Sequence, residues 1–258
     1  MNVVILCGGR GTRLYPDTEF KPKPMVEIGG KPILWHILKI YERSNYNNFV
    51  LALGYRGLDI KKYFLDYNLM SADVNIDLSK GVINQNSGLK ENWKINMIDT
   101  GVESMTGGRL LRLENTIRKD GTFMLTYGDG LSDINIKELV DFHKSHGKIA
   151  TVTAVRPRGR FGVINFDGEK VTDFHEKPQV GEGWINGGFF VFEPEIFDYL
   201  SNDSTVLEGA PMQKLTKDGQ LMAFKYKGAW QCMDTPRDRD ELNALCIEGN
   251  AFWNKLEI

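Results

Sequence analysis

Short apolar runs alternate with amphipathic stretches along the first 155 residues. The apolar runs predict buried strands, whereas apolar residues recurring on one face every 3.6 residues predict helices. Strands are expected at residues 3–7, 49–53, 94–99, 123–126 and 150–155, and helices at 33–44, 58–68, 107–118 and 136–146. This alternation predicts an α/β fold: a single doubly wound, mostly parallel, Rossmann-like sheet flanked by helices, with ligands at the carboxyl ends of its strands.

The pattern changes in the second half of the chain. Short strand-like runs at 162–166, 171–176 and 188–192 are separated by turn residues, with Asp167-Gly168 as a hairpin signal. They predict a small antiparallel or mixed extension of the sheet, and a closing helix is expected at 235–248. The polar stretch 71–93, rich in Asn, Ser and Gly, predicts a mobile excursion in the form of a long hairpin or a lid. With no linker or internal repeat, residues 1–258 are expected to form one domain.

Charge and cysteine content exclude several classes of protein. The chain has 32 basic and 34 acidic side chains, so it lacks the broad basic field of a nucleic-acid-binding protein. No apolar run approaches the roughly 18 residues of a membrane span, and no basic leader precedes the first strand. The three cysteines form no paired framework. We therefore expect no nucleic-acid partner, no membrane segment and a reducing, cytoplasmic location.

A glycine-rich basic segment directly follows the first strand. It reads Gly-Gly-Arg-Gly-Thr-Arg at residues 8–13, and a second basic cluster, Lys-Pro-Lys-Pro, follows at 21–24. Glycines let backbone N–H groups approach phosphate oxygens, and fixed cations neutralise a polyphosphate. The segment matches neither common phosphate motif: Leu14 occupies the third glycine position of the dinucleotide fingerprint, and Gly30-Lys31 continues into Pro32 instead of the Ser or Thr of a P-loop. It predicts a nucleoside triphosphate site of another class.

Two acidic residues are candidates for a metal site. Asp129 follows the strand at 123–126, and Asp234 precedes the last helix. One or two carboxylates plus substrate phosphates suit Mg²⁺. Taken alone, Asp129 is equally well explained as a turn residue and Asp234 as a helix N-cap, so the metal role requires both to face the glycine-rich segment. His143 and His146 share a helix face but lack an evident third ligand, so we expect a structural role for them.

Seven motifs occur in register along essentially the whole chain. They are GGRGTRLYP at 8–16, KPKPM at 21–25, IGGKPIL at 28–34, Gly-Asp at 128–129, EKP at 176–178, NGGFFVF at 186–192 and Trp-x-x-x-Asp at 230–234. Together they resemble the sugar nucleotidyltransferase family. Further segments at 99–109, 123–130 and 233–238 are similar to those of members that use CTP and glucose 1-phosphate. The resemblance implies these two substrates, Mg²⁺, CDP-glucose synthesis for surface polysaccharide, and a homo-oligomer, either a hexamer or a tetramer. It also implies a nucleotide-binding half at 1–155 and a sugar-phosphate-binding half at 156–258.

The family reaction is attack of a sugar 1-phosphate on the α-phosphorus of the triphosphate. A phosphate monoester is largely dianionic near neutral pH, so no general base is required and catalysis reduces to alignment and charge stabilisation. We expect Arg13 to stabilise the departing pyrophosphate and Lys23 to bridge the α-phosphate and the sugar phosphate. The Mg²⁺ ligands would be Asp129 and Asp234.

The remaining expected site residues bind the nucleotide or the sugar phosphate. The nucleotide set is Leu6, Cys7, Gly8, Gly9, Arg10, Gly11, Thr12, Arg13, Lys23, Ser104, Arg109 and Gly128. The sugar-phosphate set is Glu176, Lys177, Asn186, Gly187 and Gly188. Arg109 is expected to donate to cytosine O2 or N3; the alternative is a solvated residue in the first turn of a helix.

Three other functions remain open. The first is a family member that uses another nucleotide or sugar phosphate. The second is a glycosyltransferase, which needs Asp-x-Asp after a strand, whereas Leu131 stands two residues after Asp129. The third is a non-catalytic sensor of sugar phosphates, which should have lost the metal carboxylates or the cations. Phe252 and Trp253 near the end of the chain are expected to serve a subunit interface.

Overall fold

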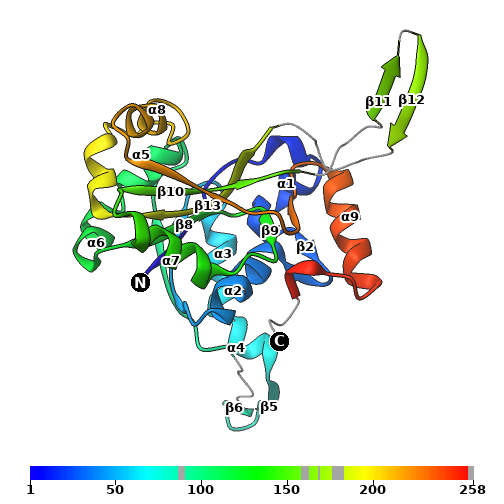
Figure 1. Cartoon of the computed structure of the whole chain (residues 1–258). Helices are drawn as coiled ribbons and strands as arrows, with labels where there is room; N and C mark the ends of the chain where they lie inside the picture. The colour runs from blue at the N-terminus through cyan, green and yellow to red at the C-terminus, as the bar shows by residue number, and fades with distance from the viewer. Residues whose placement is uncertain (87–90, 158–162, 168, 176–182, 255–258) are drawn as a thin grey trace.

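The computed structural model describes residues 1–86, 91–157, 163–167, 169–175 and 183–254. Its centre is a seven-stranded sheet in the order β14-β10-β13-β8-β1-β4-β7 (Figure 1). β13 runs antiparallel to both of its neighbours, and every other pairing in this sheet is parallel. The expected mostly parallel α/β sheet is confirmed. Its strands are β1 (Val3–Cys7), β4 (Asn48–Leu53), β7 (Lys94–Asp99), β8 (Phe123–Tyr127), β10 (Ala150–Val155), β13 (Ile185–Phe192) and β14 (Leu221–Lys225).

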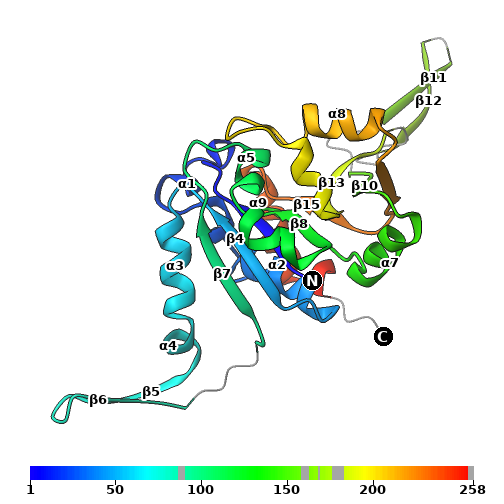
Figure 2. The ribbon, with the colours of Figure 1, turned by 90° about the vertical axis from the view of Figure 1, so that its left-hand side faces the viewer.

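Helices cover both faces of this sheet (Figures 1 and 2). Alternate residues of β1 enter different cores, because successive side chains of a strand point to opposite faces. Val3, Ile5 and Cys7 pack with α2, while Val4 and Leu6 pack with α5 and α6. The helices are α1 (Asp17–Phe20), α2 (Ile33–Arg43), α3 (Gly57–Leu65), α4 (Tyr67–Ser71), α5 (Thr106–Leu111), α6 (Glu114–Ile117), α7 (Ile136–His146), α8 (Ala210–Lys217) and α9 (Pro236–Ile247). Among the described residues, no helix is both long and apolar enough to cross a bilayer.

Two hairpins project from the body at opposite ends (Figures 1 and 2). β5 (Asp73–Asp77) pairs with β6 (Val82–Asn86), so the hairpin form expected within 71–93 is present. β11 (Val163–Asp167) pairs antiparallel with β12 (Lys170–His175), but the two form a separate sheet, and of the strands expected in the extension only β13 joins the central sheet. Gly168 of the expected turn lies outside the described residues.

Short elements near the carboxyl ends of the strands were not predicted by the hydrophobic pattern. β2 (Glu27–Ile28) pairs with β3 (Lys31–Pro32), and β9 (Gly130–Ser132) pairs with β15 (Trp230–Cys232). The 3-10 turns are η1 (Thr12–Leu14), η2 (Lys23–Met25), η3 (Arg118–Asp120), η4 (Pro194–Tyr199) and η5 (Phe252–Asn254). Among them, η1 and η2 carry Arg13 and Lys23, and the pair of β9 with β15 brings Asp129 and Asp234 together, as described below.

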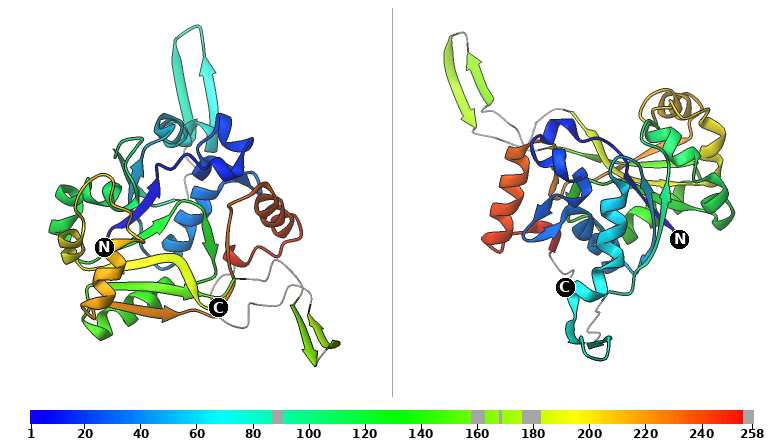
Figure 3. Two further views of the ribbon diagram at one scale, coloured as in Figure 1. Left: turned by 90° about the horizontal axis from the view of Figure 1, so that it is seen from above. Right: turned by 180° about the vertical axis from the view of Figure 1, so that it is seen from behind.

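The C-terminal segment folds back onto the N-terminal third of the chain (Figure 3). Asn243 of α9 accepts a hydrogen bond from the Gly29 backbone N–H at 2.8 Å. Trp253 is fully buried, and its indole N–H donates to His36 Nδ1 at 3.1 Å. The interface role expected for Phe252 and Trp253 is wrong, because both rings are part of the core.

Candidate active site

Four charged side chains converge beyond the carboxyl ends of β1 and β8. Lys23 Nζ lies 2.6 Å from Asp129 Oδ2 and 2.6 Å from Asp234 Oδ1. Arg13 Nη1 lies 2.9 Å from Asp234 Oδ2. Only 12% of the Lys23 side chain is exposed, against 75% for Arg13. Asp234 therefore contacts the glycine-rich segment through Arg13, and both aspartates contact Lys23 of the second basic cluster, so their role as metal ligands stays a prediction.

The pairing of β9 with β15 explains how aspartates so distant in sequence meet. Cys232 stands opposite Gly130 in this antiparallel pair, and the Met233 N–H donates to the Asp129 carbonyl at 2.8 Å. The residue after Met233 is Asp234, so its carboxylate lies beside that of Asp129.

Asp234 is not the N-cap of α9. Thr235 is the N-cap, and its hydroxyl accepts from the Asp238 N–H in a capping box. Asp238 Oδ2 also accepts from the Asp234 and Thr235 N–H groups, at 3.0 and 2.8 Å. The cap is thus complete without the Asp234 side chain, which is directed at Lys23 and Arg13 instead.

Lys23 begins the turn η2 between two prolines, and the glycine-rich loop packs against it. Gly11 has φ of 62°, and a Cβ there would lie 3.0 Å from Lys23 Cβ. Burial alone would lower the pKa of Lys23, but the carboxylates of Asp129 and Asp234 outweigh burial and raise it. The ammonium group therefore keeps its charge at neutral pH, as a phosphate ligand must.

The loop after β1 offers backbone groups and few side chains. Leu6 and Cys7 end the strand, and Gly9, Arg10 and Thr12 are exposed. Arg10 pairs with Glu103 at 2.5 Å. Burial raises the pKa of the Cys7 thiol far above its ordinary value, so this residue stays an unreactive core thiol.

Gly128 allows three segments to meet closely. A Cβ at this position would lie 2.9 Å from Pro24 Cγ and 3.0 Å from the Leu6 carbonyl oxygen. Any side chain at Gly128 would push the end of β8 away from the loop and from the Lys23 turn. Close packing therefore explains why the Gly-Asp motif has a glycine at position 128.

Arg109 is buried in α5, with 4% of its surface exposed. Its guanidinium donates to the carbonyl oxygens of Gly101 at 2.6 Å and Gly8 at 2.9 Å, and further to Leu53, Val102 and the Thr100 hydroxyl. The alternative of a solvated helix residue is wrong. Direct contact of Arg109 with a base stays a prediction, and so does the role of Ser104, whose hydroxyl donates to the Thr100 carbonyl at 2.6 Å.

The start of β13 carries the expected sugar-side residues. Asn186 Oδ1 accepts from the Gly188 N–H at 2.8 Å, and Asn186 Nδ2 donates to the Tyr127 hydroxyl at 3.1 Å. The Gly187 carbonyl accepts from the Trp230 indole at 2.7 Å. Sequence reasoning missed Tyr127, although its place directly before Gly128 was a usable signal. Glu176 and Lys177 lie outside the described residues.

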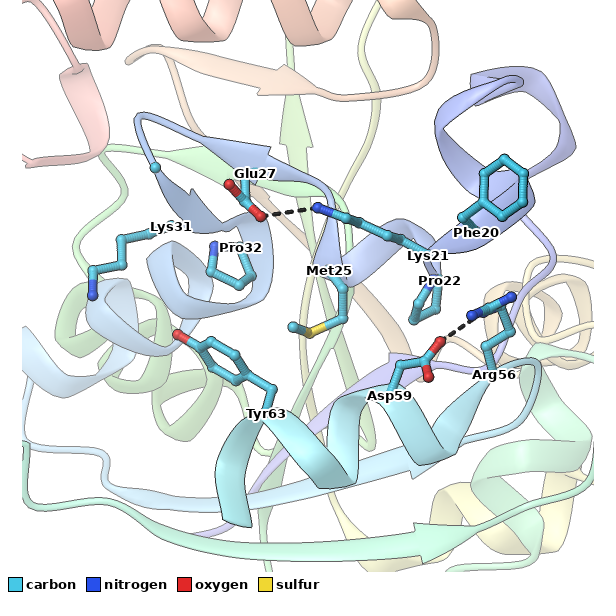
Figure 4. A pocket seen from close by; sticks show the side chains of 11 residues that line it. Phe20, Lys21, Pro22, Met25, Glu27, Lys31, Pro32, Arg56, Asp59 and Tyr63 are labelled. Atoms are coloured by element: carbon cyan, nitrogen blue, oxygen red, sulfur yellow. Dashed lines mark hydrogen bonds and ion pairs between the residues drawn. The ribbon is translucent and has the colours of Figure 1, made fainter. Parts of the chain in front are cut away.

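A separate pocket of about 400 Å³ lies beside this site, between the segment around Lys21 and α3 (Figure 4). Lys21 pairs with Glu27 at 2.9 Å, and Arg56 pairs with Asp59 at 2.6 Å (Figure 4). None of the four converging charges lines this pocket. The residues predicted for catalysis and metal binding therefore lie in the charge cluster and not in this pocket.

The two carboxylates fit a divalent cation held jointly with a substrate. Lys23 Nζ contacts both carboxylates, so the side chains of Asp129 and Asp234 point to the same position. Within the described ranges, no group of three or more His, Cys, Asp or Glu side chains could hold a metal by itself. Phosphate and water oxygens would have to complete the coordination, as is usual for Mg²⁺.

The two histidines of α7 have structural partners. His143 Nδ1 and His146 Nε2 lie 2.8 and 2.7 Å from the hydroxyl of Thr151, and His143 Nε2 lies 3.1 Å from Glu193. These contacts agree with the structural role expected from the sequence.

The chain was compared with families of known proteins, with curated sequences and with solved structures. A family model described as nucleotidyl transferase matches residues 2–238. The chain belongs to this family. The resemblance noted from the sequence motifs is confirmed, and the family generally uses a divalent metal, a nucleotide and a sugar phosphate.

Two curated relatives match over nearly their whole length. The chain is 47% identical to a glucose-1-phosphate cytidylyltransferase of Salmonella typhi, covering 100% of both sequences. It is 44% identical to a probable glucose-1-phosphate cytidylyltransferase of Bacillus subtilis, covering 98% of this chain and 99% of the relative.

Solved structures share the fold. HddC from Yersinia pseudotuberculosis superimposes with a TM-score of 0.68 at 25% identity, covering 96% of this chain and 99% of that one. A putative glucose-1-phosphate thymidylyltransferase from Bacillus anthracis gives a TM-score of 0.68 at 19% identity, covering 95% of each chain. The latter likeness supports the fold alone.

Proposed function

We propose that the protein transfers CMP from CTP to α-D-glucose 1-phosphate, giving CDP-glucose and pyrophosphate. The observation that carries the proposal is the meeting of Arg13, Lys23, Asp129 and Asp234 at one point. The full-length identity to two glucose-1-phosphate cytidylyltransferases supports the choice of CTP and of glucose 1-phosphate.

The chain contributes alignment and charge to the reaction. A phosphate oxygen of the sugar 1-phosphate attacks the α-phosphorus, and the bond to the β-phosphate oxygen breaks. Lys23 faces the α-phosphate and the incoming phosphate, which otherwise repel one another. Arg13, exposed at the mouth of the cluster, stabilises the charge that develops on pyrophosphate. No proton has to be removed from the attacking phosphate, so no base is assigned.

A divalent cation, Mg²⁺ in our proposal, supplies charge neutralisation between the phosphates when bound. Asp129 and Asp234 would hold it. The backbone between Leu6 and Thr12 would bind the triphosphate, and the segment from Ser104 to Arg109 the base. Residues Asn186 to Gly188 would bind the sugar, together with Glu176 and Lys177 from outside the described residues.

Three wider expectations also stay proposals. We expect the nucleotide to occupy mainly residues 1–155 and the sugar phosphate mainly 156–258. A homo-oligomer, either a hexamer or a tetramer, is expected from the family resemblance, and a reducing, cytoplasmic location from the unpaired cysteines. CDP-glucose would then supply surface polysaccharide synthesis.

The test is a matrix of nucleoside triphosphates against sugar 1-phosphates with Mg²⁺, measured by pyrophosphate release. We expect the highest kcat/KM with CTP and glucose 1-phosphate. Turnover with UTP or dTTP only would contradict the base assignment, and turnover with another sugar 1-phosphate only would contradict the sugar. If no pair releases pyrophosphate, transfer of the sugar from an added nucleotide sugar to an acceptor, with release of the nucleoside diphosphate, would indicate a glycosyltransferase, and binding without turnover a sensor.

A further inference from the structure

One carboxylate outside all the motifs links the base side of the site to its sugar side. Glu208 precedes α8. Its Oε2 accepts a hydrogen bond from the Thr106 hydroxyl at 2.7 Å, and its Oε1 accepts from the Tyr127 hydroxyl. Thr106 opens α5, within the expected base segment, whereas Tyr127 ends β8 just before Gly128. Glu208 thus bridges two elements that border different substrates.

The contacts continue from Tyr127 to the sugar side. The Tyr127 hydroxyl accepts from Asn186 Nδ2 at 3.1 Å, and Asn186 Oδ1 accepts from the Gly188 N–H at 2.8 Å. Both the oxygen and the nitrogen of the Asn186 amide therefore have partners, and these partners fix which of the two atoms is Nδ2. Asn186 has a second amide N–H, for which no acceptor is found among the described residues. A substrate hydroxyl could accept from it.

The direction of these hydrogen bonds follows from the charges. Burial, and next the Glu208 carboxylate, raise the pKa of Tyr127 far above its ordinary value, so the phenol stays protonated. An ionised carboxylate can only accept, so the Tyr127 proton points to Glu208 and its lone pairs face Asn186. Gly188, with φ of 78°, makes room for the ring, because a Cβ there would lie 2.6 Å from it.

Although Glu208 is exposed, its backbone is fixed on α5. The Leu207 N–H donates to the Thr106 hydroxyl at 2.9 Å, and the Gly108 N–H donates to the Thr205 carbonyl at 3.1 Å. The approach is close: a Cβ on Gly108 would lie 2.2 Å from the Asp203 carbonyl oxygen. The carboxylate is therefore presented by a docked segment and not by a free loop.

We infer that Glu208 is a positioning residue for the sugar phosphate, acting through Tyr127 to hold the amide of Asn186 against a sugar hydroxyl. The inference rests on the proposed function, since the sugar is placed at Asn186 there. A site built to hydrogen-bond a hydroxyl discriminates against substrates that lack it or point it elsewhere. Glu208 should thus influence the KM for the sugar phosphate and the choice among sugar 1-phosphates.

The test compares E208A, Y127F and the double variant in steady-state kinetics with varied CTP and varied glucose 1-phosphate. Each single variant should raise the KM for glucose 1-phosphate by up to about tenfold, the effect of one hydrogen bond. The KM for CTP and kcat should change less than about twofold. The preference for glucose 1-phosphate over galactose 1-phosphate should fall by the same factor as KM rises. The double variant should be no worse than either single variant, because both remove the same contact.

Two further variants separate this role from a structural one. E208Q keeps an acceptor for Tyr127 and should restore a KM near that of the wild type. D203N alters the same segment at the exposed Asp203–Arg112 pair and should leave both KM values unchanged.

Several outcomes would overturn the inference. One is an unchanged sugar KM in E208A, and another is additive losses in the double variant. A parallel rise of both KM values with a lowered melting temperature would show a merely structural residue. If the wild type releases no pyrophosphate from CTP and glucose 1-phosphate, the proposed function fails instead, and the same variants are then assayed with the substrate pair that is active.

Discussion

Replacing Lys23 by methionine tests the charge cluster most directly. Methionine keeps an unbranched apolar stem of similar length and removes only the ammonium group. At an effective dielectric constant of about 20, two unit charges separated by 2.6 Å attract by about 6 kcal/mol before desolvation is counted. Lys23 makes this contact twice, with Asp129 and with Asp234. Its removal leaves Asp129 without the ammonium group it faces and leaves Asp234 with Arg13 as its cation.

Two measurable effects follow for K23M. Removing one partner of a buried ion pair costs about 3–5 kcal/mol of stability. The aspartates are 25% and 19% exposed and can recover some hydration, so we expect a loss of about 2–3 kcal/mol. Loss of a cation from the reacting phosphates should lower kcat by about 10²- to 10³-fold, as for other electrostatic groups at a transition state.

The assay is pyrophosphate release with saturating CTP, glucose 1-phosphate and Mg²⁺, accompanied by thermal unfolding with and without Mg²⁺. Because K23M removes the cation shared by Asp129 and Asp234 and leaves only Arg13 beside Asp234, Mg²⁺ should raise its melting temperature more than that of the wild type. The matched control is K21M, two residues away, whose side chain is 53% exposed and pairs with Glu27 at the surface. K21M should retain activity within about twofold. A folded K23M enzyme with a kcat as high as that of K21M would refute the assignment.

Three further variants test other parts of the structure. D234N should lower kcat about tenfold or more and raise the Mg²⁺ concentration needed for half-maximal rate, because it removes one carboxylate of the cluster. H143Q addresses the buried histidine whose pKa is lowered by burial despite the nearby Glu193. Because His143 binds a proton more readily in the unfolded chain than in the folded protein, the free energy of unfolding of the wild type should fall as pH drops below about 6.5. The fall should be less steep in H143Q, and urea titration from pH 7.5 to 5 measures both. W253A removes a fully buried ring and the donor to His36, and should cost about 3–5 kcal/mol of stability by the same titration while leaving the kcat of folded enzyme nearly unchanged.

The central sheet could be predicted because its strands carry local signals. β1, β4 and β8 are continuous apolar runs, as expected for parallel strands buried on both faces. β10 matches its expected range, and α7 does so because its ends are marked: Asn135 caps α7, accepting from the Glu138 N–H, and Gly147 ends it with φ of 60°. Local pattern and global fold agree in these elements.

The geometry of the site could be predicted only in part. Lys23 and Asp129 stood out by their neighbours in sequence, but the pairing of β9 with β15 did not. Each of these strands has three residues and no hydrophobic period, so nothing in the sequence marks which segment it joins. Without that pair, Asp234 is indistinguishable from a helix cap.

Polar contacts between residues far apart in the chain also could not be predicted from the sequence. Glu208 and Tyr127 are 81 positions apart, and an exposed glutamate before a helix is an ordinary surface residue by composition. The interface role predicted for Trp253 was wrong because the sequence signal was ambiguous, not because it was missing. An aromatic residue near the end of a chain is equally compatible with a subunit interface and with a core, and only the position of His36 decides between them.

The charge balance of the cluster suggests how the site accepts its substrates. Arg13 and Lys23 carry two positive charges, and Asp129 and Asp234 carry two negative ones, so the cluster is neutral without ligands. If the proposed site is right, an incoming triphosphate would compete for the cations, and its divalent counter-ion would compete for the carboxylates. Each exchange alone would leave Lys23 or the two aspartates, all largely shielded from water, without a counter-charge, whereas both exchanges together preserve neutrality. Nucleotide and metal should therefore bind with positive coupling, each raising the affinity of the other by the same factor. Such a site is stable when empty and still requires little rearrangement of charge when the phosphates arrive.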